Sequence, residues 1–246
     1  IDIDGEIGDI SSFSQLTSDK RVEHILERAE YYGYSGDRVK GLIFCSTKKE
    51  ASELSKKFNE TGRYSTIMLC GENSQEERES AVERLVTTNH PHKLDYIFTV
   101  DIFNEGVDIP EINQVIMLRP TESPIIFVQQ LGRGLRKADG KEFVIVIDFI
   151  GNYQNNYMIP IALSGDRTGN KDNIRRSLME GNNLIQGAST IYFDEVSRKR
   201  IYASIDETNL NRYKILKAEY ERLKYKLGRI PFLKEFDEHG ELDPLR

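Results

Sequence analysis

The chain has 246 residues, of which 38% are hydrophobic and 30% charged, and this composition indicates a soluble globular protein of one large domain, or one domain plus a smaller one. No apolar run reaches the roughly 20 residues of a membrane-spanning helix, and the acidic start has no signal-peptide pattern. The net charge of −6 does not by itself indicate nucleic-acid binding, although residues 196–234 hold eleven Lys and Arg against four Asp and Glu.

Helix and strand signals alternate through the first 150 residues. Short apolar runs with little alternation indicate strands buried on both faces, and the intervening segments repeat apolar residues at helical spacing. This alternation predicts an α/β fold, a parallel sheet with helices on both faces and right-handed crossovers. The predicted strands are 41–46, 64–70, 94–100, 113–119 and 142–149, and the predicted helices are 17–33, 48–62, 74–86 and 129–140.

Capping residues mark several of these helices. Ser74 and Glu77 have the spacing of a capping box at the start of a helix. A hydroxyl at the start of the first helix and a glycine at the end of a helix are the expected boundary signals. These boundary residues are Thr17 or Ser18, Gly33 and Gly62.

The sequence changes character after residue 150. It becomes polar and aromatic, and helical patches follow at 171–180, 194–205 and 210–228. The basic residues of 196–234 would contact a nucleic-acid backbone if they face outward, and a solvated helix face is the alternative.

We therefore predict three parts: 1–36 is a linker with a leading helix, 37–165 is the α/β lobe, and 166–246 is a smaller, mainly helical appendage. Because the chain does not begin with Met, we expect it to be a piece of a longer protein. Cys45 and Cys70 lie in apolar runs, which predicts buried, reduced thiols and a cytoplasmic protein. The four histidines are scattered, and no metal site is predicted.

Ligand sites of parallel α/β sheets lie beyond the carboxyl ends of the strands. Ser46 ends the first predicted strand and Thr47 follows it, Gly71 follows the second and Thr99 lies near the end of the third. These residues are therefore candidate ligand contacts. Thr47 could instead serve only as the cap of the next helix, and Gly71 could be required only by a turn.

The segment QQLGRGLRKADG, residues 129–140, places two glycines inside a predicted helix, and each lowers helix stability by roughly 1 kcal/mol relative to Ala. At helical spacing Gln129, Gly132, Arg133 and Arg136 share one face. A planar, permanently charged guanidinium suits phosphate oxygens. The pair could act as fingers on a nucleotide held by a neighbouring domain, whereas pairing with local acids is the alternative.

Four segments, in this order, resemble motifs of superfamily two helicases. GLIFCST (41–47) resembles motif IV, and LCGENSQEERESAVERL (69–85) resembles the G…R element that follows it. FTVDIFNEGVDIPEINQVI (98–116) resembles motif V, and FVQQLGRGLR (127–136) resembles motif VI, Q-x-x-G-R-x-x-R. Downstream, VIDFIGNYQNNYMIPIALSGD and LGRIPFLKEF resemble a bacterial family that joins such a core to a phospholipase D-like nuclease module and a C-terminal domain of unknown function.

The resemblance implies the second RecA-like lobe of an ATP-dependent helicase or translocase. ATP and Mg would be bound mainly by a first RecA-like lobe upstream in the same chain, and the nucleic acid would be DNA, with RNA as the alternative. Arg133 and Arg136 would contact the γ-phosphate, with Arg136 as the finger, and Gln129 would lie beside the nucleotide.

The resemblance also assigns residues of motifs IV and V. Gly106 would let the backbone approach the nucleotide or the other lobe, and Asp108 would lie near the ribose or help couple the lobes. Glu105 would also belong to the nucleotide site, and it stands where many RNA helicases have Arg, which favours DNA. The nucleic-acid contacts would be Ser46, Thr47, Gly71 and Thr99. The sequence departs from the family at Val100, because many relatives have Thr directly before the Asp of motif V.

Two motifs of a complete motor are missing. The chain has no G-x-x-x-x-G-K-[ST] and no Asp-Glu-x-[Asp/His], so it lacks the phosphate-cradling loop and the acid that holds Mg²⁺. We therefore expect no ATP hydrolysis by this chain alone. The alternative function is a non-catalytic nucleic-acid-binding or scaffolding module with a RecA-like shape. A dinucleotide-binding domain is disfavoured because no G-x-G-x-x-G follows the first strand.

Overall fold

The structure is a computed structural model, and the chain divides into two compact units that are described separately. The first unit comprises residues 1–120 and 129–152, and the second comprises 121–128 and 153–246. The structure describes residues 17–100, 109–119, 137–149, 160, 170–180, 192–207, 220–221, 223–225, 227–232 and 235.

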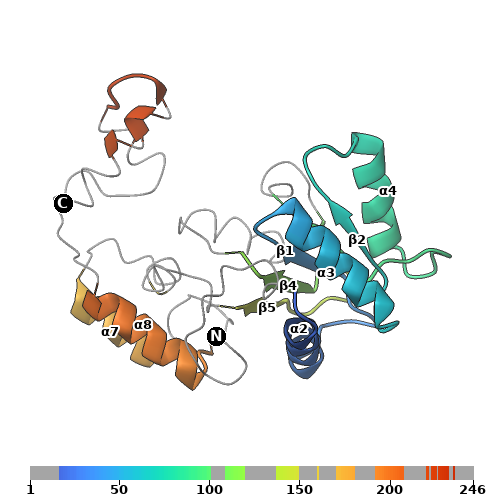
Figure 1. Cartoon of the computed structure of the whole chain (residues 1–246), viewed down its shortest axis with the longest axis horizontal. Helices are drawn as coiled ribbons and strands as arrows, with labels where there is room; N and C mark the ends of the chain where they lie inside the picture. Colours follow the sequence, from blue (N-terminus) through green and yellow to red (C-terminus); the bar gives the residue numbers. More distant parts are fainter. Residues whose placement is uncertain are drawn as a thin grey trace. The chain divides into compact units, whose positions relative to one another are not determined.

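The first unit is built on a five-stranded parallel sheet (Figure 1). Its order is β2-β3-β1-β4-β5, and every neighbouring pair is parallel. In this register Phe44, Leu69, Thr99 and Met117 end their strands side by side. The predicted parallel α/β fold is confirmed. The strands are β1 (Gly41–Phe44), β2 (Thr66–Leu69), β3 (Tyr96–Thr99), β4 (Gln114–Met117) and β5 (Ile145–Asp148).

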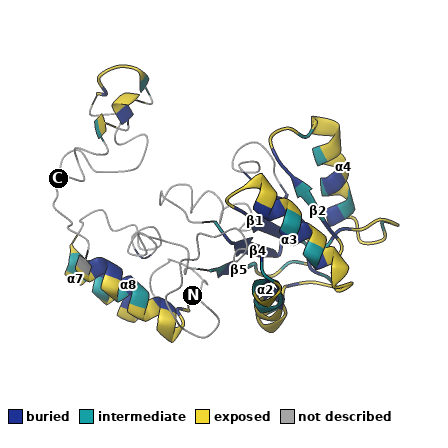
Figure 2. Ribbon diagram, viewed as in Figure 1, coloured by how far each residue is buried: buried dark blue, intermediate teal, exposed yellow. Residues whose placement is uncertain are grey.

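Helices cover both faces of this sheet. On one face α2 (Asp19–Tyr32) and α3 (Lys48–Glu60) contact each other, and their buried side chains join alternate strand residues in one core. The other residues of each strand point to the opposite face, where the crossover rule places α4 (Gln75–Val86), which contacts β3. Figure 2 shows the strands mostly buried and the outer sides of the helices exposed.

The helix boundaries follow the predicted caps. Ser18 accepts a hydrogen bond from the backbone of Arg21, and Gly33 ends α2 with φ +66°. The Ser74–Glu77 capping box at the start of α4 is confirmed. Gly62 has φ +67° just beyond α3, a conformation that glycine adopts without strain.

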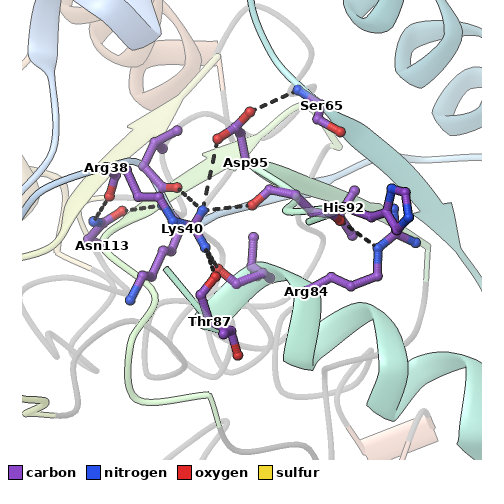
Figure 3. Close-up of polar contacts among 11 residues, drawn as sticks. Arg38, Lys40, Ser65, Arg84, Thr87, His92, Asp95 and Asn113 are labelled. Atoms are coloured by element: carbon purple, nitrogen blue, oxygen red, sulfur yellow. Dashed lines mark hydrogen bonds and ion pairs between the residues drawn. The ribbon is translucent and has the colours of Figure 1, made fainter. Parts of the chain in front are cut away.

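The strands are shorter than predicted, and polar residues that precede them bind across the sheet's amino edge (Figure 3). Asp95 accepts a hydrogen bond from the Ser65 backbone at 2.8 Å, and Asn113 accepts one from the Lys40 backbone at 2.8 Å. Arg38 donates to the carbonyls of Leu85, Thr87 and Leu94. The polar groups at this edge are therefore paired within the chain, whereas ligand sites of parallel sheets lie at the carboxyl edge.

Two asparagines bind outward backbone groups at the two ends of edge strand β2. Asn59 of α3 accepts a hydrogen bond from the Thr66 N–H at 2.8 Å and donates one to the Thr66 carbonyl at 3.1 Å. Asn73 accepts a hydrogen bond from the Cys70 N–H at 2.8 Å. The outward N–H groups of Thr66 and Cys70 and the Thr66 carbonyl are thus paired within the chain.

A buried polar link fixes the centre of the sheet. The Tyr96 hydroxyl donates to Gln114 at 2.5 Å, and the Gln114 amide donates to the carbonyls of Ala29 and Gly33 at the end of α2. The Tyr96 ring lies directly over Gly41, where an added Cβ would sit 2.2 Å from a ring carbon. Only glycine therefore fits at the start of β1.

The second unit contains α7 (Lys171–Glu180) and α8 (Glu195–Glu207), which pack against each other. Ile174, Leu178, Ile201 and Ile205 are buried between them, and Arg175 pairs with Asp206. Both predicted helical patches are confirmed. Most of the predicted helix at 210–228 lies outside the described residues, and the three-part domain division stays a prediction. No helix among the described ranges has the length and apolar character that crossing a membrane requires.

We predict that Gly41→Ala destabilises the protein by about 1–3 kcal/mol, because the methyl group overpacks against the Tyr96 ring. Gly71→Ala is the matched control: its Cβ would meet no atom within 4 Å and its φ is not in the left-handed region, so its effect should stay within about 0.5 kcal/mol. Urea unfolding of both variants measures the difference. Equal midpoints would contradict the packing constraint.

Candidate nucleic-acid interface

The described candidate residues lie at one edge of the sheet. Ser46 follows β1, Gly71 follows β2, and Thr99 ends β3, which lies between β1 and β2. Because all three strands are parallel and in register, their carboxyl ends lie side by side. The six other candidates, Gln129, Arg133, Arg136, Glu105, Gly106 and Asp108, lie outside the described residues.

Thr47 is the N-cap of α3. Its hydroxyl accepts a hydrogen bond from the Glu50 N–H at 3.1 Å, so the predicted capping role is confirmed. Ser46, Thr47 and the first residues of α3, Lys48 and Lys49, are exposed. The positive end of the helix dipole and two lysines therefore meet at this turn, a combination that attracts phosphate.

Gly71 is not required by the fold of its own turn. It is exposed, its φ lies outside the left-handed region and a Cβ there would meet open space. The turn is held by its neighbours, because Arg78 donates to the Gly71 carbonyl at 2.8 Å and Asn73 donates its backbone N–H to the Cys70 carbonyl at 3.2 Å. The turn explanation for this glycine is therefore disfavoured, and close approach of another molecule remains as a reason for it.

Thr99 differs from the other three residues in its exposure. It is 0% exposed, whereas Ser46, Thr47 and Gly71 are exposed. Its carbonyl accepts a hydrogen bond from the Cys45 N–H at 3.0 Å, which continues the ladder between β1 and β3. Thr99 therefore supports the edge from beneath, and its side chain does not reach the surface.

One ion pair links the turns that follow β1 and β2. Lys48 Nζ lies 2.5 Å from a carboxylate oxygen of Glu72, the residue after Gly71. This hydrogen bond raises the pKa of Lys48 and lowers the pKa of Glu72. Both side chains are at least half exposed, so the pair contributes little to stability. It does, however, place a carboxylate where an incoming phosphate would meet Lys48.

A buried acid beneath the turn was not predicted from the sequence. Glu50 is 0% exposed, and its carboxylate accepts a hydrogen bond from the Ser46 N–H at 3.0 Å. Burial raises its pKa, which the Ser46 hydrogen bond and the charge of Arg21 lower in part. Burial, and then the Glu50 charge, raise the pKa of the neighbouring Cys45 thiol, so this cysteine stays protonated. The signal in the sequence was a Glu three residues after the capping Thr47.

Comparison with protein families supports the assignment of this lobe. Residues 20–138 match the family "Helicase conserved C-terminal domain". The matched segment begins at the second residue of α2 and includes the first four strands and all of the candidate residues. The chain carries a helicase C-terminal domain. Residues 216–246 match a second family, "Domain of unknown function (DUF8090)".

Relatives of the chain include ATP-dependent helicases. A Saccharomyces cerevisiae protein assigned as the ATP-dependent helicase IRC3 is 26% identical over 161 residues, which are 61% of this chain and 23% of that protein. The EcoKI endonuclease subunit, a type I restriction enzyme of Escherichia coli K12, is 29% identical over 119 residues, which are 45% of this chain and 10% of that protein. The chain thus spans less than a quarter of either relative.

Similar solved structures include two DEAD-box proteins. Domain 2 of the helicase Mss116p bound to an RNA duplex has a TM-score of 0.43 at 20% identity, covering 87% of this chain and 75% of that chain. The Escherichia coli DEAD-box protein SrmB, bound to regulator of ribonuclease activity A, also has a TM-score of 0.43, at 19% identity, covering 62% of this chain and 76% of that chain.

Proposed function

We propose that the chain is the second half of the motor core of an ATP-dependent helicase or translocase acting on nucleic acid, with DNA favoured over RNA. The observation that carries this proposal is the exposed carboxyl edge, where Ser46, Thr47 and Gly71 come together within the helicase C-terminal domain. The partner would be a first RecA-like lobe upstream in the same natural chain, which would hold most of the ATP and Mg²⁺ contacts.

In this proposal the nucleic-acid backbone crosses the carboxyl edge between α3 and the turn after β2. Phosphates would bind the hydroxyls of Ser46 and Thr47 and the positive end of α3, with Lys48 supplying charge. Gly71 would allow the backbone to approach closely. Thr99, being buried, would act by supporting this edge.

The nucleotide would be contacted by segments outside the described residues. Arg133 and Arg136 would reach the γ-phosphate, with Arg136 as the finger that stabilises transition-state charge and Gln129 beside it. Gly106 and Asp108 would lie next to the nucleotide or the other lobe, together with Glu105. The support for these roles is the Q-x-x-G-R-x-x-R spacing and the family match across residues 20–138.

The alternative is a non-catalytic nucleic-acid-binding module that keeps the same fold. Nucleic-acid binding would be retained in this case, but no residue would act on ATP. A nucleic-acid-stimulated ATPase assay on the full-length protein decides between the two functions.

We predict that the isolated 246-residue chain folds cooperatively yet shows no ATPase activity above background, with or without DNA. The physical reason is the missing phosphate loop and Mg²⁺ acid. Circular dichroism during urea unfolding and a phosphate-release assay measure the two properties. Robust turnover that survives a contamination control would refute the half-motor proposal.

In the full-length protein, Arg136→Ala should lower kcat by about 10³-fold or more while nucleotide affinity changes less, because a finger acts mainly on transition-state charge. Arg133→Ala should have a similar effect or weaken ATP binding more strongly. Steady-state ATPase kinetics and binding of a fluorescent nucleotide separate the two effects. A double variant with near wild-type kcat would disprove the finger assignment.

Charge changes at the carboxyl edge should alter single-stranded DNA binding in opposite directions. Lys48→Glu should weaken affinity and lower the salt slope by about one unit, because a phosphate contact is lost. Glu72→Gln should strengthen affinity, since it removes the carboxylate that occupies Lys48.

The control for this pair is Lys56→Glu, which makes the same charge change at an exposed residue farther along α3. Fluorescence anisotropy over a range of salt concentrations measures all three variants. If Lys48→Glu and Lys56→Glu have equal effects, the edge is not the binding surface.

A further inference from the structure

Glu50 holds both residues of the exposed turn before α3. Its carboxylate accepts a hydrogen bond from the Ser46 N–H at 3.0 Å, and its own N–H donates to the Thr47 hydroxyl oxygen at 3.1 Å. The Ser46 N–H is therefore turned inward and is not available to a ligand. The Thr47 oxygen accepts from within, which leaves its own proton to donate outward.

The start of α4 offers a comparison, in which Glu77 binds the N–H of the cap residue itself, whereas Glu50 binds the N–H of Ser46, the residue before the cap Thr47. Glu77 is the third residue of α4, as Glu50 is of α3, and its carboxylate accepts a hydrogen bond from the Ser74 N–H at 2.7 Å. Glu77 is exposed, and its hydrogen bonds lower its pKa, whereas burial raises the pKa of Glu50. Helix capping can therefore be satisfied at the surface, and it does not require burial of this carboxylate.

The buried carboxylate has a counter-charge on another helix. A guanidinium nitrogen of Arg21 on α2 lies 3.9 Å from a carboxylate oxygen of Glu50, and neither of these two atoms has a hydrogen-bond partner. A buried ion pair of this geometry contributes little net stability, because desolvation offsets the attraction. Attraction between these two charges therefore does not by itself explain why the carboxylate is buried.

We infer that Glu50 is the positioning residue of the nucleic-acid site: it fixes the Ser46–Thr47 turn so that the Thr47 hydroxyl donates to a phosphodiester oxygen, and Arg21 supplies its counter-charge. This inference rests on the proposed function, because it assigns the ligand of the turn as single-stranded nucleic acid. Glu50 itself does not touch the ligand, since it is fully buried. The leading helix α2 thereby contributes to a site that lies on other elements.

The test uses the 246-residue chain with Glu50→Ala, Glu50→Gln and the control Leu54→Ala. Leu54 is a buried residue one turn farther along the same helix, and its truncation removes core packing but leaves in place both hydrogen bonds of Glu50 to the turn. Two properties are measured: hydrogen exchange of the Ser46 amide by NMR, and affinity for a fluorescent single-stranded oligodeoxynucleotide. Arg21→Met combined with Glu50→Gln serves if the unpaired Arg21 prevents folding of Glu50→Gln alone.

Glu50→Ala should raise the exchange rate of the Ser46 amide about tenfold and lower DNA affinity about tenfold. Each change corresponds to the loss of one hydrogen bond to a charged acceptor. Glu50→Gln should keep the Ser46 exchange rate and the DNA affinity within about threefold of the unmodified chain, because the Gln carbonyl still accepts the Ser46 hydrogen bond. Leu54→Ala should lower the unfolding midpoint but leave the Ser46 exchange rate and the DNA affinity unchanged.

Unchanged Ser46 exchange in Glu50→Ala, or equal losses in the Ala and Gln variants, would overturn the inference. An affinity loss in Leu54→Ala as large as in Glu50→Ala would overturn it as well, because general destabilisation would then explain both. A third outcome separates the two claims. If Ser46 exchange rises in Glu50→Ala and not in Glu50→Gln, but the unmodified chain binds no oligonucleotide, then Glu50 fixes the turn and the proposed function is wrong.

Discussion

The carboxyl edge depends on the register of parallel strands, and a buried hydrogen bond between Tyr96 and Gln114 secures that register. The two residues lie on β3 and β4, on either side of β1, and the ring of Tyr96 crosses over Gly41 to reach its partner. Gln114 then holds the end of α2 through two carbonyls. Because a shift of one residue would reverse every side chain between the two faces, this link also determines which residues emerge beyond the strands.

The five strands and three helices of the first unit could be predicted because their signals are local. The predicted helix 129–140 is wrong at its described end, where Ala138 forms a bridge with Lys141 and the residues between them form a turn. Apolar runs, hydroxyl caps and terminal glycines identified the five strands and α2, α3 and α4 to within a few residues. The strand ends could not be predicted, because they depend on contacts between distant residues. Asn113 illustrates this, since it begins the predicted strand 113–119 but its side chain binds Ser35, Arg38 and Lys40 at the amino edge.

The candidate site was predictable in part for the same reason. Order along the chain placed Ser46, Thr47 and Gly71 after strands, and parallel pairing then brings such residues to one edge. The exposure of the candidate residues was not predictable. Thr99 is buried because β3 lies between β1 and β2, and this strand order depends on pairing between distant segments. Glu50 was not predicted because a Glu in the first turn of a helix is ordinarily a surface residue, whereas here Arg21 of α2, distant in the sequence, lies against it.

The two arginines at the ends of α4 have a mechanical consequence. Arg78, near the start of α4, donates hydrogen bonds to the carbonyls of Cys70 and Gly71 in the turn after β2. Arg38, which precedes β1, donates hydrogen bonds to the carbonyls of Leu85 and Thr87 at the other end of the helix. The helix is therefore anchored at the carboxyl edge and at the amino edge of the sheet. A displacement of the turn at Gly71 would therefore be resisted by α4 as well as by β2. Because α4 is bound at both edges, it would transmit part of that displacement to the amino edge of the sheet.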